Sequence, residues 1–99
     1  MVKHYIVWKL KEGIDLEQVK KDIKSNLEGL VGQIEGLLEM KILTDKLSSS
    51  SGDVLMDSTF TSEQALKNYS AHPKHVFVAN TFVRPYTEVR LSFDSKIKD

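Results

Sequence analysis

A tyrosine and two histidines lie close together in the stretch YSAHPKHV, which contains Tyr69, His72 and His75 around Pro73. Imidazole and phenol groups move protons near neutral pH and donate hydrogen bonds to developing oxyanions. A third histidine, His4, lies near the start of the chain. These residue types could serve proton transfer next to a carbonyl group, such as an aldol-type ring closure or a tautomerisation. They could also form a metal site, or simply a polar helix corner.

The expected backbone around Pro73 suggests a role for each residue. Proline disfavours helical geometry at His72 and suits the first position of a new helix, so His72 should cap a helix that begins at Pro73. His75 then lies in the first turn, where the positive end of the helix dipole favours a neutral imidazole, a competent base. Tyr69, one helical turn before His72, could donate its hydroxyl to a carbonyl or enolate oxygen while His75 takes the adjacent proton.

The first strand supplies further candidate residues. Residues 3–11 alternate with period two and place His4, Ile6 and Trp8 on one side. We expect His4 to line the same cavity and to bind the ligand or orient His75, and we expect Ile6, Trp8 and His72 to contact the ligand. The structural alternative is that Trp8 packs in the core and that His72 only caps its helix.

A metal site is the second interpretation of the histidines. Imidazoles three residues apart can share an ion, and Asp57 or Glu88 could add an oxygen ligand. Pro73 separates the two histidines, however, and His72 is expected to bond to the backbone, so too few ligands converge. The sequence contains no glycine-rich phosphate loop, nucleophile elbow or dinucleotide fingerprint. We therefore predict neither a metal nor a cofactor.

Composition limits the class of protein. A chain of 99 residues predicts one domain over residues 1–99, with a polar tail from about residue 95. Fourteen basic and fourteen acidic residues cancel and alternate, which argues against a nucleic-acid partner. The absence of cysteine excludes a disulfide framework and a thiol nucleophile. Without a secretion signal or a long apolar run, we expect a soluble, cytoplasmic protein with no membrane partner.

Periodicity and capping signals predict the elements that position these residues. The expected elements are a strand over 3–11, a helix capped by Asp15 that ends between Val31 and Ile34, strands over 37–47 and 53–60 joined by the serine loop 48–52, a helix capped by Thr61, a helix over 73–83 and a strand over 86–93. On the last strand, Thr87, Val89, Leu91 and Phe93 should share one face.

This order of elements predicts an α+β fold, the ferredoxin-like βαββ(αα)β protomer with a four-stranded antiparallel sheet and helices on one face. Val7, Leu43 and Leu55 fall on strand faces opposite some of their apolar neighbours, so we expect the sheet to be partly apolar on both sides. An open apolar sheet needs a cover. Homodimerisation through the sheet faces is the simplest solution.

The stretches KHYIVWKLKEG and NYSAHPKHV, together with the serine-loop hairpin, resemble the stress-responsive A/B barrel domain family. The resemblance spans nearly the whole chain. It implies a ferredoxin-like protomer whose sheet joins that of a second copy to close a homodimeric α/β barrel. A plant polyketide cyclase of the family carries the pattern Y-x-x-H-P-x-H, so the resemblance also implies acid–base roles for Tyr69 and His75, with an early-strand histidine at the position of His4.

Two classes of function therefore remain. The first is a small ligand-binding protein or cofactor-free enzyme of cyclase, isomerase or lyase type, whose pocket contains His4, Tyr69 and His75 and takes a small organic ligand. The second is a non-catalytic, stress-related or structural dimer in which these residues hold the helix corner. An enclosed cavity reached by the His75 ring and the Tyr69 hydroxyl would favour the first. A solid interior with both groups bonded to backbone would favour the second.

Overall fold

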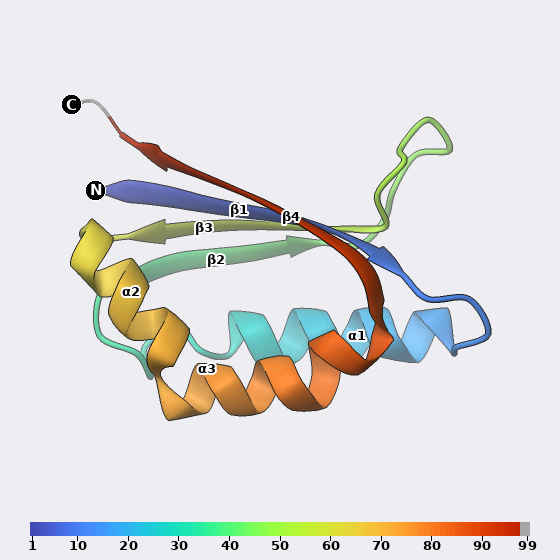
Figure 1. The fold of residues 1–99 in the computed structure, drawn as a ribbon, viewed down its shortest axis with the longest axis horizontal. Coiled ribbons are helices and arrows are strands. Elements are labelled where there is room, and N and C mark those ends of the chain that lie inside the picture. Colours follow the sequence, from blue (N-terminus) through green and yellow to red (C-terminus); the bar gives the residue numbers. More distant parts are fainter. Residues whose placement is uncertain (98–99) are drawn as a thin grey trace.

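A computed structural model describes residues 1–97 as an antiparallel sheet covered on one face by helices (Figure 1). The elements are β1 (Val2–Leu10), α1 (Leu16–Glu28), β2 (Leu37–Leu43), β3 (Val54–Phe60), α2 (Glu63–Ala71), α3 (Pro73–Val78), a π-helical turn (Ala79–Val83), a 3₁₀ turn (Arg84–Tyr86) and β4 (Thr87–Lys96). The strand order is β2-β3-β1-β4, and all neighbouring strands are antiparallel. This is the ferredoxin-like arrangement that the order of elements predicts. Within residues 1–97, no helix is long and apolar enough to cross a bilayer.

β1 has one buried and one open side, as its alternation predicts. His4, Ile6 and Trp8 are buried beneath the helices, whereas Val7 and Lys9 are exposed on the other face. The core lies between the covered sheet face and the apolar sides of the helices. Its largest fully buried side chains are Tyr69, Phe60, Ile23, Leu27, Ile42 and Met56.

The helix starts agree with the capping signals except at α2. Asp15 caps α1 by accepting the Gln18 N–H at 3.2 Å, as predicted. α2, however, is capped by Ser62, whose hydroxyl accepts the Ala65 N–H at 3.1 Å. The prediction of Thr61 as the cap was wrong because the Thr61 N–H donates to the Gly36 carbonyl at 2.9 Å, which keeps that residue in the loop beside β3.

Other boundaries also differ from the predictions. α1 ends at Glu28, because Gly29 caps it and the chain turns through Gly32 at a φ of +87°. β2 ends at Leu43, so the connection to β3 is longer than the serine run. β4 continues through Lys96, because its last residues pair with β1. The predicted polar tail is therefore partly strand, and residues 98–99 lie outside the described residues.

Gly36 lies where a side chain would collide with α2. Its φ is +88°, and an added Cβ would lie 2.6 Å from the Ala65 Cβ. We expect Gly36→Ala to lower the free energy of unfolding by about 3 kcal/mol, from left-handed strain together with steric overlap. Urea denaturation measures this loss.

Gly32→Ala is the matched control. Its φ of +87° is nearly the same, but an added Cβ would meet nothing within 4 Å. This variant should therefore lose only the backbone contribution, about 1–2 kcal/mol. Equal losses in the two variants would show that the contact with α2 is unimportant.

No helix covers the other face of the sheet, and a row of apolar side chains crosses it. Residues Leu43, Leu55, Val7 and Leu91 pair in one row across all four strands. Leu91 is 68% exposed, and Phe93, on the same face of β4, is 66% exposed. We call this surface the open face. Contiguous apolar surface of this kind marks an interaction site.

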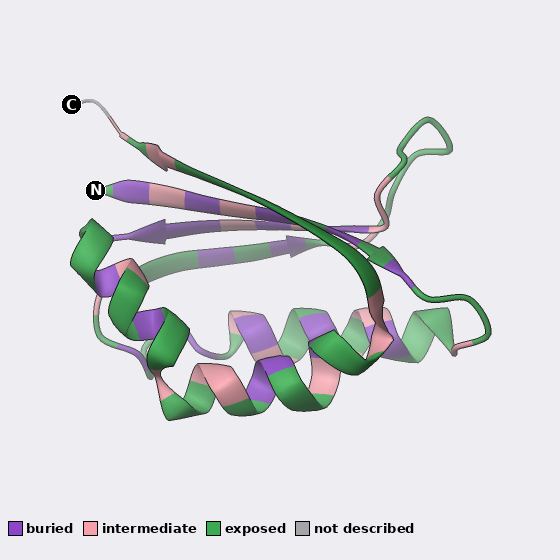
Figure 2. Cartoon of the chain, in the orientation of Figure 1, coloured by how far each residue is buried: buried purple, intermediate pink, exposed green. Residues whose placement is uncertain are grey.

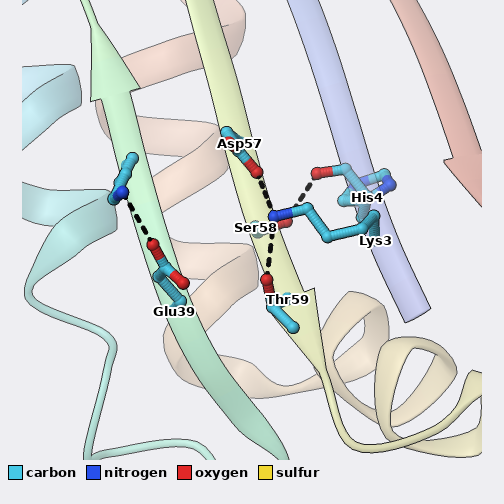
Figure 3. Close-up of polar contacts among 7 residues, drawn as sticks. Lys3, His4, Glu39, Asp57, Ser58 and Thr59 are labelled. Atoms are coloured by element: carbon cyan, nitrogen blue, oxygen red, sulfur yellow. Dashed lines mark hydrogen bonds and ion pairs between the residues drawn. The ribbon is translucent and has the colours of Figure 1, made fainter. Parts of the chain in front are cut away.

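Polar contacts border the apolar row of the open face. Lys3 lies 2.5 Å from an Asp57 carboxylate oxygen and donates to the Thr59 hydroxyl at 2.9 Å. Figure 3 shows Lys3 reaching from β1 to both residues on β3, with Glu39 on β2. Lys3 and Asp57 therefore pair with each other within the protomer, so the charges at that end of the apolar row are paired ones.

β4 is an edge strand that turns its polar side toward the helices. Its register places Arg90 opposite Trp8 and Asp94 opposite His4, both on the covered face. β4 packs on β1 and makes few contacts with the helices, so its residues remain mostly exposed (Figure 2). A register shift after Lys9 pairs Thr87 with Leu10. Thr87 therefore faces the helices with Arg90, which corrects the simple alternation expected from the sequence.

Candidate functional site

A cavity of about 80 Å³ lies between the sheet and the corner formed by α2 and α3. All predicted site residues except His72 line it. The lining residues are His4, Ile6, Trp8, Leu27, Met56, Tyr69, Ser70, His75, Ala79, Val83, Arg84, Thr87 and Arg90. The fold thus brings the first strand and the YSAHPKHV stretch to one place.

The Tyr69 hydroxyl is a buried polar group without a partner. Tyr69 lies on α2 and is 2% exposed, and among residues 1–97 nothing hydrogen-bonds to its Oη. Its ring packs edge-on against Phe60, with centroids 5.0 Å apart. Burial raises the pKa of the Tyr69 hydroxyl far above its usual value, so it remains a hydrogen-bond donor. Such an unsatisfied group costs about 1–3 kcal/mol, so its presence calls for an explanation.

His75 lies against Tyr69 and has the protonation state of a base. The two ring centroids are 4.2 Å apart. His75 Nδ1 lies 3.3 Å from the Ser70 carbonyl oxygen; because a carbonyl only accepts, Nδ1 carries the proton and Nε2 keeps its lone pair. Burial lowers the pKa of His75, and the charges of Arg84 and Arg90 lower it further, against the opposing effect of the Ser70 bond. The ring is therefore neutral near pH 7.

His4 is held by its neighbours on both sides in the sheet. Its Nδ1 bonds to an Asp94 carboxylate oxygen on β4. The Ser58 hydroxyl donates to the His4 carbonyl at 2.7 Å (Figure 3). Asp94 fixes the orientation of the imidazole, because a carboxylate that accepts from Nδ1 leaves Nε2 as the free ring nitrogen. Asp94 was not predicted as a site residue, since its position depends on the β1–β4 register.

His72 serves the helix corner and does not line the cavity. Its Nδ1 accepts the Lys74 N–H at 3.1 Å, so it caps α3 as predicted. Pro73 occupies the first helical turn behind it. His72 therefore caps the helix that carries His75.

Two further residues of the cavity, Arg84 and Arg90, were missed by the sequence analysis. They are the only arginines in the chain, and both line the cavity. Arg84 follows the π-helical turn and Arg90 lies on the covered side of β4. Neither location follows from simple periodicity. The one available signal was that arginine is rare in a chain rich in lysine, which singles out these two residues.

The histidines lack the companions that a metal site requires. Among the described residues, no group of three or more His, Cys, Asp or Glu side chains could hold an ion. Asp57, considered as a possible ligand, lies on the open face with Lys3. Glu88 is exposed at the register shift of β4.

A larger hollow lies elsewhere, between the sheet and the loop of residues 44–53. Its volume is about 550 Å³, and serine and leucine side chains form much of its lining. Its charged groups include Lys46 and Asp53, which pair with each other at 2.6 Å. No histidine or tyrosine lines it. Size alone therefore does not make it the better candidate for proton transfer.

Comparisons with known proteins relate this chain to one family. Residues 2–97 match the model of the Stress Responsive A/B Barrel Domain family. Olivetolic acid cyclase from Cannabis sativa is 30% identical over 95 residues, covering 94% of this chain and 93% of the cyclase. Stress-response A/B barrel domain-containing protein HS1 from Arabidopsis thaliana is 30% identical over 84 residues, covering 83% of this chain and 77% of HS1.

The fold is also found in solved structures. A dimeric protein of unknown function with a ferredoxin-like fold, from Bacteroides fragilis, superposes with a TM-score of 0.89. The two chains are 21% identical, and the match covers 97% of this chain and 95% of the other. At this identity the likeness shows the shared fold, which confirms the ferredoxin-like prediction.

Proposed function

This chain belongs to the stress-responsive A/B barrel domain family, and on that basis we propose that it forms a homodimer whose protomers each bind a small carbonyl compound and transfer a proton on it. The observation that carries this proposal is the buried, unpartnered Tyr69 hydroxyl beside the neutral His75 ring in one cavity. The ligand supplies the hydrogen-bond acceptor that Tyr69 lacks.

The proton transfer uses the two groups together. His75 Nε2 takes a proton from the carbon next to the ligand carbonyl, and the electron pair of that C–H bond moves toward the carbonyl oxygen. The resulting enolate oxygen accepts a hydrogen bond from Tyr69 Oη. Return of the proton to another atom gives a tautomer. Alternatively, attack of the enolate carbon on a second carbonyl carbon of the ligand closes a ring, and the alkoxide that forms takes the proton back from His75. The relationship to a cyclase supports chemistry of this kind.

His4 has a supporting role in this scheme. It lines the cavity from β1, and Asp94 holds its ring. Its Nε2 is available to orient the ligand or a water molecule at the reacting carbon. Ile6 and Trp8 form the apolar wall beside it and exclude solvent.

Homodimerisation through the open face completes the proposal. The row from Leu43 to Leu91 leaves a four-stranded apolar surface in contact with water in the single protomer. The Bacteroides fragilis protein with the same fold is described as dimeric. Pairing two open faces about a two-fold axis buries both surfaces and leaves the helices, with their cavities, on the outside.

A second candidate function is a non-catalytic dimeric module. The size of the cavity favours it, because about 80 Å³ is well below the roughly 300 Å³ at which drug-sized ligand sites begin. In that case the Tyr69 and His75 rings only fill the corner. The two candidates differ in whether the Tyr69 hydroxyl contributes to the binding of a carbonyl compound.

Tyr69→Phe is expected to stabilise the protein and to impair binding at the same time. Removing a buried hydroxyl that has no partner should raise the free energy of unfolding by about 1 kcal/mol. Loss of the donor should weaken binding of pentane-2,4-dione, a neutral test compound, about tenfold. Urea denaturation and isothermal titration calorimetry measure the two quantities.

Tyr86→Phe is the control, because Tyr86 packs against the core and does not line the cavity. It should leave diketone binding unchanged. A Tyr69→Phe variant that loses stability and binds the diketone as the wild type does would assign the hydroxyl a structural role and favour the non-catalytic module.

A further inference from the structure

The charged side chains that line the cavity are all positive. Both arginines of the chain line the cavity, together with two histidines, and no aspartate or glutamate is among the lining residues. We propose that the ligand carries a carboxylate group and that Arg84 and Arg90 bind it, which makes the substrate a small oxo carboxylate. This inference rests on the proposed function above and adds the class of substrate to it.

The two arginines come from different elements and line one cavity. Arg84 is in the 3₁₀ turn that follows the helical layer, and Arg90 is on β4, at the position paired with Trp8. Both residues are exposed as well as lining the cavity. They therefore lie where the cavity meets solvent, one on the helix side and one on the sheet side.

Neither guanidinium is neutralised within the protomer. The only side-chain bond that Arg84 makes among residues 1–97 is to a neutral amide, the Asn80 Oδ1 at 2.5 Å. No ion pair within the described chain involves an arginine. Asp94, the acid on the covered side of β4, is bonded to His4. Two guanidinium forks thus keep their capacity to bind an anion, and a carboxylate matches that planar geometry with paired hydrogen bonds.

The size of the cavity indicates how such a ligand would lie. A volume of about 80 Å³ corresponds to the space of roughly two or three water molecules. It can hold the carbonyl end of a small molecule next to Tyr69 and His75, but little more. The carboxylate then lies at the rim with the arginines. Both arginine charges disfavour the protonated form of His75. Because both arginines line the same cavity as the His75 ring, an anion bound to them lies close to the base.

Acetoacetate and its methyl ester form a matched pair of test compounds, since both carry the 3-oxo group and only the first carries a charge. We expect the wild-type protein to bind acetoacetate at least tenfold more tightly than the ester in low salt. Arg84→Gln and Arg90→Gln should each weaken acetoacetate binding about tenfold and change ester binding less than twofold. Isothermal titration calorimetry measures the affinities, and circular dichroism checks that each variant is folded.

Lys21→Gln is the control for loss of a positive charge. Lys21 is exposed on α1 and lines none of the pockets described for residues 1–97, so the variant should bind both compounds as the wild type does. Equal affinity for acid and ester, unchanged in both arginine variants, would overturn the carboxylate assignment and leave the proposed function standing. Failure of both compounds to bind would overturn the two proposals together.

Competition experiments identify the kind of anion. Acetate should displace acetoacetate from the wild-type protein more strongly than inorganic phosphate does at equal concentration. Stronger displacement by phosphate would overturn the carboxylate assignment in favour of a phosphorylated ligand.

Discussion

Leu91→Lys is expected to separate the proposed dimer into folded monomers. Leu91 is 68% exposed on β4 and belongs to the apolar row of the open face. In the proposed dimer this position is buried, and an unpaired charge there costs about 2 kcal/mol or more. Because of the two-fold symmetry, each dimer buries two such lysines and the cost applies twice. The dissociation constant should therefore rise about 1,000-fold. Sedimentation velocity over a range of concentrations measures it.

The matched control is Val31→Lys. Val31 is an exposed apolar residue, 41% accessible, in the turn after α1 and away from the sheet. Its substitution should leave the dissociation constant unchanged. A wild-type protein that stays monomeric at all concentrations would refute the dimer, as would a Leu91→Lys variant that associates as strongly as the wild type.

His75→Gln is expected to remove most of the catalysed proton exchange. In the wild-type protein we expect exchange of solvent deuterium into the carbon between the carbonyl groups of methyl acetoacetate, above the rate in buffer. General base catalysis contributes about 10²–10⁴-fold, and glutamine has no basic nitrogen to replace Nε2. Proton NMR of the test compound follows the exchange directly.

The pH profile adds a second readout for His75. Burial and the neighbouring positive charges lower the pKa of His75 below its usual 6.5, so the neutral, basic form persists at more acidic pH. The wild-type exchange rate, corrected for the buffer, should therefore hold as the pH falls through 6.5 and decline only as it passes the lowered pKa. A decline already centred at or above 6.5 would contradict this assignment.

The same lowered pKa has a consequence for folding. The unfolded chain, in which His75 has its usual pKa, binds this proton more readily than the folded chain. Stability from this group is therefore complete above about pH 6.5 and is lost as the pH falls toward the folded pKa.

His72→Gln controls for the loss of a histidine near the corner. His72 caps α3 and does not line the cavity, so this variant should exchange deuterium at close to the wild-type rate. A loss as large as that of His75→Gln would mean that the corner as a whole, and not the His75 base, supports the exchange.

Local signals in the sequence were enough to predict much of the fold. The alternation of β1 gave the correct buried side for His4 and Trp8, and the caps at Asp15 and His72 follow from short-range hydrogen bonding. The order of elements then leaves few topologies, because helices must cover one face of the sheet. Boundaries were less certain because pairing with a distant strand decided them, as at Lys96 opposite Val2.

The sequence predicted the site residues whose positions depend on local geometry. It missed those whose positions depend on the pairing register of distant strands. Tyr69 and His75 are joined by a corner that Pro73 imposes, so their proximity can be read from neighbouring residues. Asp94 and Arg90 reach the site through the β1–β4 register and a shift near Lys9. Arg84 follows a π-helical turn, which no periodic pattern predicts. The apolar residues of β4 lie on the open face and are exposed. The usual rule that apolar residues face the core would therefore assign the wrong side of this strand to the core.

The exposed edge strand gives this scaffold a route to diversification. On β4, Arg90 and Thr87 line the cavity and Asp94 bonds to His4, yet the strand contributes little to the core and contacts the helices sparsely. Mutations at these three positions therefore meet weak selection for folding while altering what the cavity accepts. Descendants of one ancestral chain could acquire new ligand preferences through this strand alone, with the proposed acid–base pair on the helices retained.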